Sequence, residues 1–168
     1  MRIPFVQVPV FPRSLLPAIF LFHVGCGATM IPNTSVEDND GNREVLEFME
    51  RYRHAVEDRD VDVLLGMAAA SYYDDNGTPR GDDDLDYDTL RVNLSEWNDS
   101  IVDCRYEIRY RDIEWREDRK VYVTYRYTAS FQVTDADGEQ RWVRRLGDNR
   151  VVLAMDGSTG TFSILTGM

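Results

Sequence analysis

The chain has 168 residues, of which 43% are hydrophobic, and this is enough for one domain with a hydrophobic core. Its formal net charge at pH 7 is -11. A surface of that charge repels phosphate backbones and anionic lipid headgroups, which argues against nucleic-acid binding and against a polybasic membrane contact.

Residues 1–25 have the pattern of a secretory signal. Two arginines precede a short apolar run, and this run is too short to span a bilayer core of about 30 Å. Cys26 follows Val24-Gly25, which resembles the lipobox of bacterial lipoproteins, although His23 stands where that motif has an aliphatic residue. The resemblance implies that Cys26 is acylated and anchors the protein to the periplasmic or extracellular side of a bacterial membrane. An ordinary secreted protein is the alternative.

Residues 26–42 are polar and contain proline, glycine and asparagine, so they are predicted to form a flexible tether. The folded domain would then span residues 43–168. A disulfide between Cys26 and Cys104 is an alternative fate for the two cysteines. Cys104 begins an alternating strand, which favours its burial as a small hydrophobe.

Three helices are predicted in the first half of the domain. The segment from Arg43 is amphipathic, because its apolar residues recur at spacings of three and four. Asp60 is expected to cap a second, short helix after the break at 58–60. Residues 71–84 read as a loop, and a third helix is expected from about Tyr87 to Trp97.

Aspartates at the start of the third helix raise the question of a calcium site. Asp84, Asp86 and Asp88 alternate as the ligands of an EF-hand loop do. Thr89 stands where that loop needs glycine, and no glutamate closes the loop at its twelfth position. The pattern therefore favours helix capping over metal binding.

The second half of the domain is predicted to be an antiparallel meander of four strands. Val121 to Val133 places seven apolar or aromatic residues on one face, as a long half-buried strand does. The preceding strand changes phase near Arg111-Asp112, which predicts a β-bulge. The following strand, 140–155, is interrupted at Gly147-Asp148-Asn149, and a second bulge or bend is predicted there. The last strand covers 161–165.

Long bent strands curl around the elements that cover their concave face, and here those elements are the helices. The expected fold class is therefore α+β, with N-terminal helices packed on a strongly bent four-stranded antiparallel sheet, a cystatin-like cone. The opening helix E-V-L-E-F-M-E-R-Y-R-H-A-V-E-D-R-D, the aspartate break after it and the closing strand F-S-I-L-T-G-M resemble the nuclear transport factor 2-like family. This family includes the SnoaL-like polyketide cyclase and ketosteroid isomerase branches.

The resemblance implies a pocket between the first helix and the inside of the sheet. Aromatic residues at strand spacing are also typical of a filled core, so both alternatives stay open. The candidate lining residues are Tyr52, Tyr106, Tyr125, Tyr127, Phe131 and Trp142.

An isomerase-type reaction in such a pocket needs a carboxylate base and a tyrosine donor. Asp148 and Asp112, at the two predicted bends, are the candidate bases, and Tyr52 or Tyr125 is the candidate donor. None of them aligns with a catalytic motif of the family. His54 lies beside Arg53, off the apolar stripe, and no second histidine of the mature chain could complete a metal triad. No metal or cofactor is expected.

Two functional hypotheses follow. The favoured one is a lipid-anchored, non-enzymatic domain at the cell envelope that binds a small apolar ligand or a protein partner. The alternative is a cofactor-free isomerase-like or cyclase-like enzyme. A pocket of about 300 Å³ or more with an acid beside a tyrosine hydroxyl would favour the enzyme, and a closed apolar cone without a buried carboxylate would favour the binding domain.

Homodimers through the outer face of the sheet are common in the family, so a homodimer is a further hypothesis. Four charged residues on this face argue against a large dry interface: Arg105, Glu107, Arg109 and Arg126.

Overall fold

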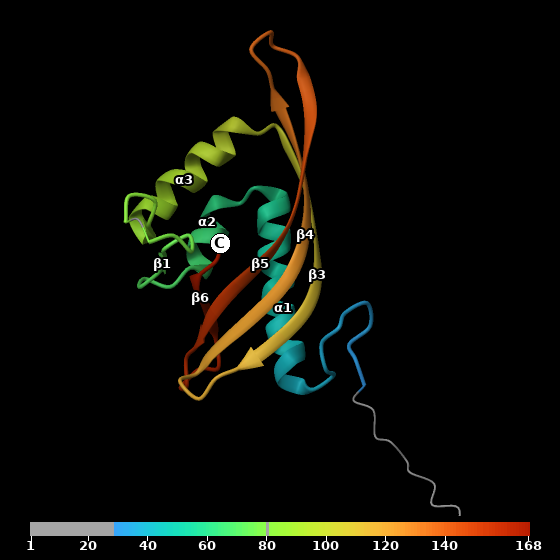
Figure 1. Cartoon of the computed structure of the whole chain (residues 1–168), viewed down its shortest axis with the longest axis vertical. Helices are drawn as coiled ribbons and strands as arrows, with labels where there is room; N and C mark the ends of the chain where they lie inside the picture. Colours follow the sequence, from blue (N-terminus) through green and yellow to red (C-terminus); the bar gives the residue numbers. More distant parts are fainter. Residues whose placement is uncertain (1–28, 80) are drawn as a thin grey trace, which may run out of the picture.

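The computed structural model describes residues 29–79 and 81–168 (Figure 1). The predicted signal segment, including Cys26, lies outside the described residues. No helix within the described ranges is long and apolar enough to cross a membrane.

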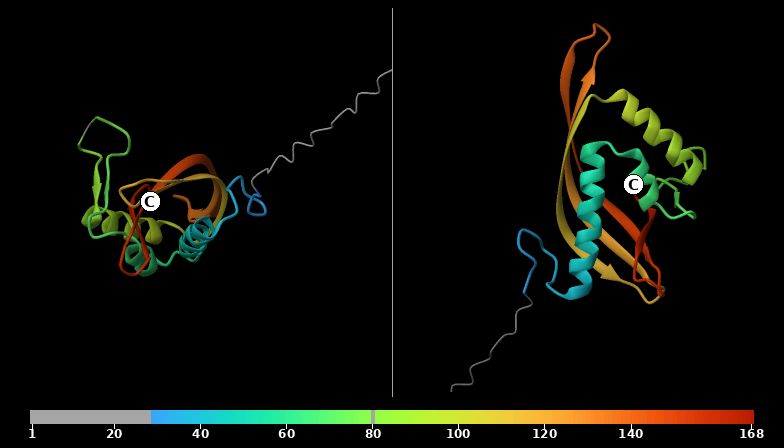
Figure 2. Two further views of the ribbon diagram at one scale, coloured as in Figure 1. Left: turned by 90° about the horizontal axis from the view of Figure 1, so that it is seen from below. Right: turned by 180° about the vertical axis from the view of Figure 1, so that it is seen from behind.

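Three helices lie on the concave face of a curved four-stranded sheet (Figures 1 and 2). The side chain of Asn39 caps the first helix and that of Asp60 caps the second, as predicted for Asp60, and each accepts a hydrogen bond from a backbone N–H three residues further on. Arg59 ends the first helix in the left-handed conformation, with φ of 58°. The helices are α1 (Asp40–Asp58), α2 (Val61–Met67) and α3 (Tyr87–Ser100).

The four long strands form an antiparallel meander in the order β3-β4-β5-β6, so the expected α+β architecture is confirmed. A short two-stranded sheet also forms within and just after the predicted loop, where Tyr73 pairs with Asp86. The strands are β1 (Tyr73–Asp74), β2 (Leu85–Asp86), β3 (Asp103–Trp115), β4 (Lys120–Thr134), β5 (Gln140–Met155) and β6 (Phe162–Thr166).

One of the two predicted bulges is present. The register of β3 against β4 shifts between Tyr110 and Asp112, which leaves Arg111 as the extra residue. The prediction of a bulge or bend at 147–149 is wrong, because β4 and β5 pair without interruption along their whole length. Gly147 lies opposite Tyr127 there, and a Cβ on this glycine would come within 2.8 Å of the Tyr127 side chain. The glycine therefore makes room for an inward-facing ring.

Residues 29–42 do not form the predicted flexible tether. They make a hairpin in which Met30 pairs with Glu37, and the N–H of Ser35 donates to the carbonyl of Tyr110 on β3 (3.2 Å). Val36 is only 2% exposed and belongs to the core. We call residues 29–39 the N-terminal hairpin.

Asn42 connects this hairpin to the rest of the domain. Its Nδ2 donates to the carbonyl of Glu37 (2.9 Å), and its Oδ1 accepts from Nε1 of Trp115 on β3 (2.9 Å). Since Asn42 lies on α1, one buried amide joins three parts of the structure.

Candidate functional site

An apolar pocket of about 270 Å³ lies between the helices and the sheet. We call it the α3 pocket, because α3 supplies one wall with Leu90, Leu94 and Trp97. These residues follow each other at helical spacing and face the sheet, where the Trp97 ring meets the Phe131 ring edge to face at 6.5 Å. The full lining is Tyr52, Val56, Leu64, Leu85, Leu90, Asn93, Leu94, Trp97, Tyr106, Phe131 and Met168.

Tyrosine side chains give this apolar pocket a polar side. Tyr52 from α1 and Tyr106 from β3 pack edge to face at 6.4 Å, and both line the pocket. The hydroxyl groups of Tyr52, Tyr106 and Tyr125 lie close enough to raise or lower one another's pKa. The Tyr125 hydroxyl also accepts a hydrogen bond from Nδ2 of Asn149 (3.0 Å). Two phenols of the pocket wall, from α1 and β3, thus lie beside a third phenol in the core.

Burial raises the pKa of Tyr52, Tyr106 and Tyr125 well above 10. The three phenols therefore stay neutral at physiological pH. In this form each hydroxyl can donate one hydrogen bond and also accept.

The structure places the six predicted lining residues in three different environments. Tyr52, Tyr106 and Phe131 line the α3 pocket. Tyr125 is fully buried in the core behind it, and Tyr127 packs against this core. Trp142 does not line the pocket but lies on the outer face of the sheet. The reason is the absent bulge in β5, since strict alternation puts Val143 and Val151 inside and Trp142 outside.

Asp148 also lies on the outer face, away from the α3 pocket. Arg126 donates two hydrogen bonds to its carboxylate, at 2.9 and 3.0 Å, and a guanidinium nitrogen of Arg111 lies 3.5 Å from its Oδ1. The hydrogen bonds from Arg126 lower the pKa of Asp148. The suggestion that Asp148 is a base in the pocket is therefore wrong. Asp112 is exposed on β3, opposite Thr124.

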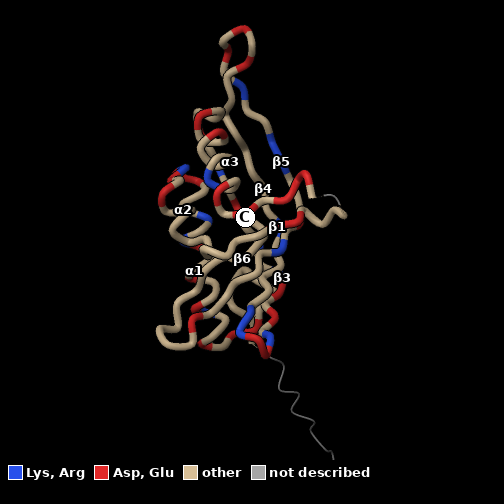
Figure 3. Tube along the Cα trace, turned by 90° about the vertical axis from the view of Figure 1, so that its left-hand side faces the viewer, with Lys and Arg blue, Asp and Glu red and all other residues tan. Residues whose placement is uncertain are grey.

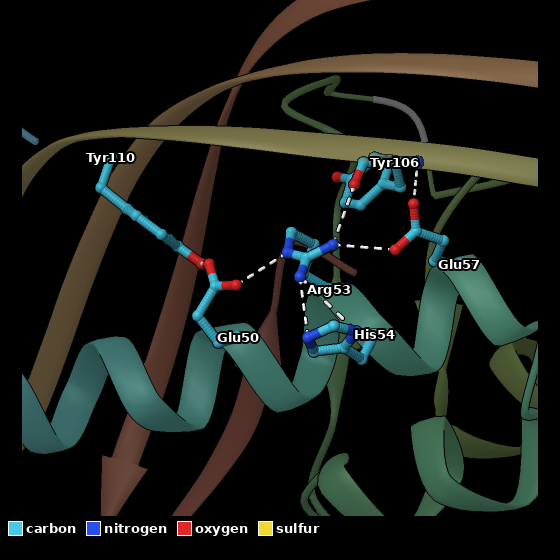
Figure 4. Close-up of polar contacts among 6 residues, drawn as sticks. All are labelled: Glu50, Arg53, His54, Glu57, Tyr106 and Tyr110. Atoms are coloured by element: carbon cyan, nitrogen blue, oxygen red, sulfur yellow. Dashed lines mark hydrogen bonds and ion pairs between the residues drawn. The ribbon is translucent and has the colours of Figure 1, made fainter. Parts of the chain in front are cut away.

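Polar groups of α1 cover the free edge of β3 (Figure 4). Arg53 lies between two carboxylates, with Nε 2.7 Å from Glu50 and Nη1 2.9 Å from Glu57. Arg53 also donates to the carbonyl of Tyr106, and the N–H of Tyr106 donates to Glu57, both at 3.4 Å. His54 is exposed, and its ring contacts the Arg53 guanidinium. This network protects a strand edge and joins helix to sheet.

A second hollow, an open groove of about 680 Å³, lies between α1 and the N-terminal hairpin. It brings an acid next to a tyrosine hydroxyl, because the hydroxyl of Tyr110 donates to Oε1 of Glu50 (2.8 Å). The other oxygen of Glu50 accepts from Arg53. With both oxygens engaged in structural contacts, Glu50 is poorly placed to take a proton from a ligand.

The aspartates before α3 make contacts within the protein. Asp84 accepts a hydrogen bond from the Tyr73 hydroxyl, Asp86 caps α3 through the N–H of Thr89 (2.8 Å), and Asp88 pairs with Arg91 at 3.0 Å. No group of three or more histidine, cysteine or acidic side chains in the described ranges could hold a metal ion.

Comparisons with known proteins find similarity in structure and not in sequence. No family model and no curated protein matches the chain. Among solved structures, a nuclear transport factor 2-like superfamily protein from Salmonella enterica is 14% identical, with a TM-score of 0.58, over 76% of this chain and 87% of that one. The chain has the nuclear transport factor 2-like fold.

Two other solved structures are similar to this chain over most of their length. Aln2 from a Streptomyces species is 15% identical, with a TM-score of 0.57, over 79% of this chain and 91% of that one. A scytalone dehydratase-like protein from Novosphingobium aromaticivorans is 11% identical, with a TM-score of 0.63, over 76% and 84% of the two chains. At these identities the similarity concerns the fold alone.

Proposed function

We propose that this nuclear transport factor 2-like domain binds a small, neutral, largely apolar ligand in the α3 pocket and does not act on it. The observation that carries the proposal is the chemistry of the pocket wall. Aliphatic and aromatic side chains from α1, α2, α3 and the sheet surround a hollow of about 270 Å³, and two tyrosines and one asparagine are the polar residues of its wall. Few, well-placed polar groups in an apolar hollow are typical of sites for small molecules.

The lining favours a neutral ligand. None of the described residues that line the α3 pocket is acidic or basic. A charged group buried there would lose its hydration without gaining a counter-ion, which is costly. A hydroxyl or carbonyl oxygen on the ligand would instead find the hydroxyl groups of Tyr52 and Tyr106, whose raised pKa values keep them neutral.

The same observations weigh against the enzymatic alternative. Proton abstraction needs a base within about 3 Å of the substrate carbon or of a bridging water. Asp148 is on the far side of the sheet, and Glu50 lies in the groove outside α1. Without an acid in the α3 pocket, its tyrosines can orient a ligand but have no partner for proton transfer.

We also propose that Cys26 anchors the domain to the periplasmic or extracellular side of a bacterial membrane, as its lipobox-like context suggests. Replacing Cys26 with Ser and measuring the membrane-associated fraction tests this. Loss of membrane association is expected, and unchanged association would refute the anchor.

The binding proposal is tested with 2-naphthol, a neutral bicyclic compound with one hydroxyl, by isothermal titration calorimetry. Leu94→Phe places a larger side chain in the pocket and should weaken binding by at least about fivefold, because it fills space that the ligand needs. Val92→Phe is the matched control on the same helix, since Val92 is 52% exposed and does not line the pocket. Absence of binding to the unmodified protein, or an equal loss in both variants, would refute the proposal.

A further inference from the structure

The outer face of the sheet is free of helices, because all three lie on the concave side (Figure 2). Every second side chain of three neighbouring strands points outward and contributes to a continuous surface there. The strand register determines which of these side chains lie side by side. We call it the outer-face patch. It consists of Arg105, Glu107, Arg109 and Arg111 on β3, Arg126, Thr128, Ser130 and Gln132 on β4, and Trp142, Arg144, Leu146 and Asp148 on β5.

The outer-face patch carries charge of the opposite sign to the rest of the protein. It contains five arginines and two acids, whereas the whole chain has 19 basic and 30 acidic residues. Blue segments follow β5 in Figure 3, and the turn at the far end of the β4–β5 hairpin is red. A local positive surface on a protein of net charge -11 attracts negative partners to this place.

Several arginines of the patch have too few acidic partners within the protein. One carboxylate, that of Asp148, forms ion pairs with both Arg126 and Arg111. Arg109 lies directly across from Arg126 in the register, and like charges in that position repel each other. Neither Arg109 nor Arg144 forms an ion pair with any residue in the described ranges.

Apolar side chains complete the patch. Trp142 is 43% exposed and Leu146 65% exposed, four residues apart on the same side of β5. The guanidinium of Arg105 lies 4.6 Å from the centre of the Trp142 ring, which orients both side chains. Exposed tryptophan and arginine side by side are typical of protein-binding surfaces.

We propose that the outer-face patch binds a short acidic polypeptide segment that also carries an apolar side chain. Carboxylates of the segment would pair with Arg109 and Arg144, and its apolar side chain would cover Trp142 or Leu146. This surface is on the opposite side of the sheet from the α3 pocket and does not depend on its function.

The size and borders of the patch favour a short segment over a long polyanion. From Arg126 to Gln132 it extends over seven residues of β4, about 20 Å. The turn after β4, at 135–139, carries three acids and borders the patch at one end. A nucleic acid or a flat anionic membrane that extends past this turn would be repelled.

A second copy of the chain fits the patch less well. A symmetric dimer through this face would place the patch of one protomer on the same patch of the other. Five arginines would then face five arginines across the interface.

The test uses a fluorescein-labelled peptide of eight alternating Glu and Leu residues, with fluorescence anisotropy at low salt. Arg144→Gln should weaken binding by about threefold or more, since it removes a charge of the patch that has no ion-pair partner among the described residues. Arg145→Gln is the matched control, because Arg145 has the same charge on the next residue of β5 but points to the other side of the strand. Its effect should stay below about 1.5-fold.

The proposal would be overturned if the peptide did not bind, or if a version with Gln in place of Glu bound equally well. An equal loss of binding in Arg144→Gln and Arg145→Gln would also overturn it, since the attraction would then be unspecific. Binding to phosphatidylglycerol vesicles that Arg144→Gln abolishes would make the partner a lipid surface instead, and a dimer in sedimentation that Arg144→Gln dissociates would make it a second copy.

Discussion

Asn42 provides a sharp test of whether the N-terminal hairpin is part of the folded domain. Asn42→Ala removes two hydrogen bonds of 2.9 Å, one to the carbonyl of Glu37 in the hairpin and one from the indole of Trp115 on β3. Each such bond contributes about 1 kcal/mol net, and a carbonyl left without a partner costs about 1 kcal/mol more. We therefore expect the free energy of unfolding to fall by about 2–3 kcal/mol.

Urea denaturation followed by circular dichroism measures this change. With an unchanged slope, the midpoint should move down by about 1 M, and the melting temperature by roughly 5–10 °C. Glu44→Ala is the control, because Glu44 is an exposed residue of the same helix, and its effect should stay within about 0.5 kcal/mol. If Asn42→Ala also changes stability by less than about 0.5 kcal/mol, the hairpin does not pack as described and the segment is a tether after all.

Three further substitutions or modifications test local features of the fold. Gly167→Ala should destabilise the domain by more than about 2 kcal/mol in the same urea assay, because Gly167 has φ of 91° and a Cβ there would collide with the carbonyl of Arg150. Asp86→Ala should cost about 1 kcal/mol through loss of the α3 cap, and an unchanged midpoint would contradict the capping role. Burial raises the pKa of the Cys104 thiol from 9.0 to about 11, so in a Cys26→Ser background this thiol should resist a thiol reagent at pH 8 until urea is added. Because the thiol ionises at lower pH in the unfolded chain, the neutral buried thiol stabilises the fold fully below pH 9, and this stabilisation is lost as the pH rises to about 11. The urea midpoint should therefore fall over that range, and a midpoint that rises would contradict the burial of Cys104.

Local patterns in the sequence predicted most of the elements and the order of the strands. The periodicity of α1, the cap of α2 and the bulge at Arg111 left direct signatures, namely an apolar stripe, a capping aspartate and a change of phase. The N-terminal hairpin left none, because only Val36 is buried in an otherwise polar segment. Its position depends on contacts with β3, which lies far away in the sequence, and composition cannot reveal such contacts.

The errors at the site have a single origin in β5. Gly147 on its own predicts a break in the strand, and one extra residue there would turn Trp142 and Asp148 toward the pocket. Gly147 instead stays in register and makes room for the Tyr127 ring. Glycine in a strand marks either a bulge or a close approach, and only the neighbouring strand decides between them.

The position of α3 could not be predicted from its own pattern. The apolar stripe formed by Leu90, Leu94 and Trp97 is visible in the sequence, but a stripe does not tell which part of the sheet it will cover. In the structure α3 crosses near Phe131 instead of filling the concave face, and the α3 pocket is the space that remains. Tyr52 from α1 and Tyr106 from β3 line this pocket, while nothing in the pattern of α3 predicts that it forms the opposite wall.

The bulge at Arg111 affects both faces of the sheet. Tyr110 before the bulge and Ile113 after it both face inward. Since they are three residues apart and strand side chains alternate, one residue between them must be left out of the alternation. That residue is an arginine, and its guanidinium reaches Asp148 on the outer face. Asp148 is thereby shared between two arginines, which leaves Arg109 without an acidic partner among the described residues. The bulge that keeps Tyr110 and Ile113 on the inner face thus adds positive charge to the outer-face patch.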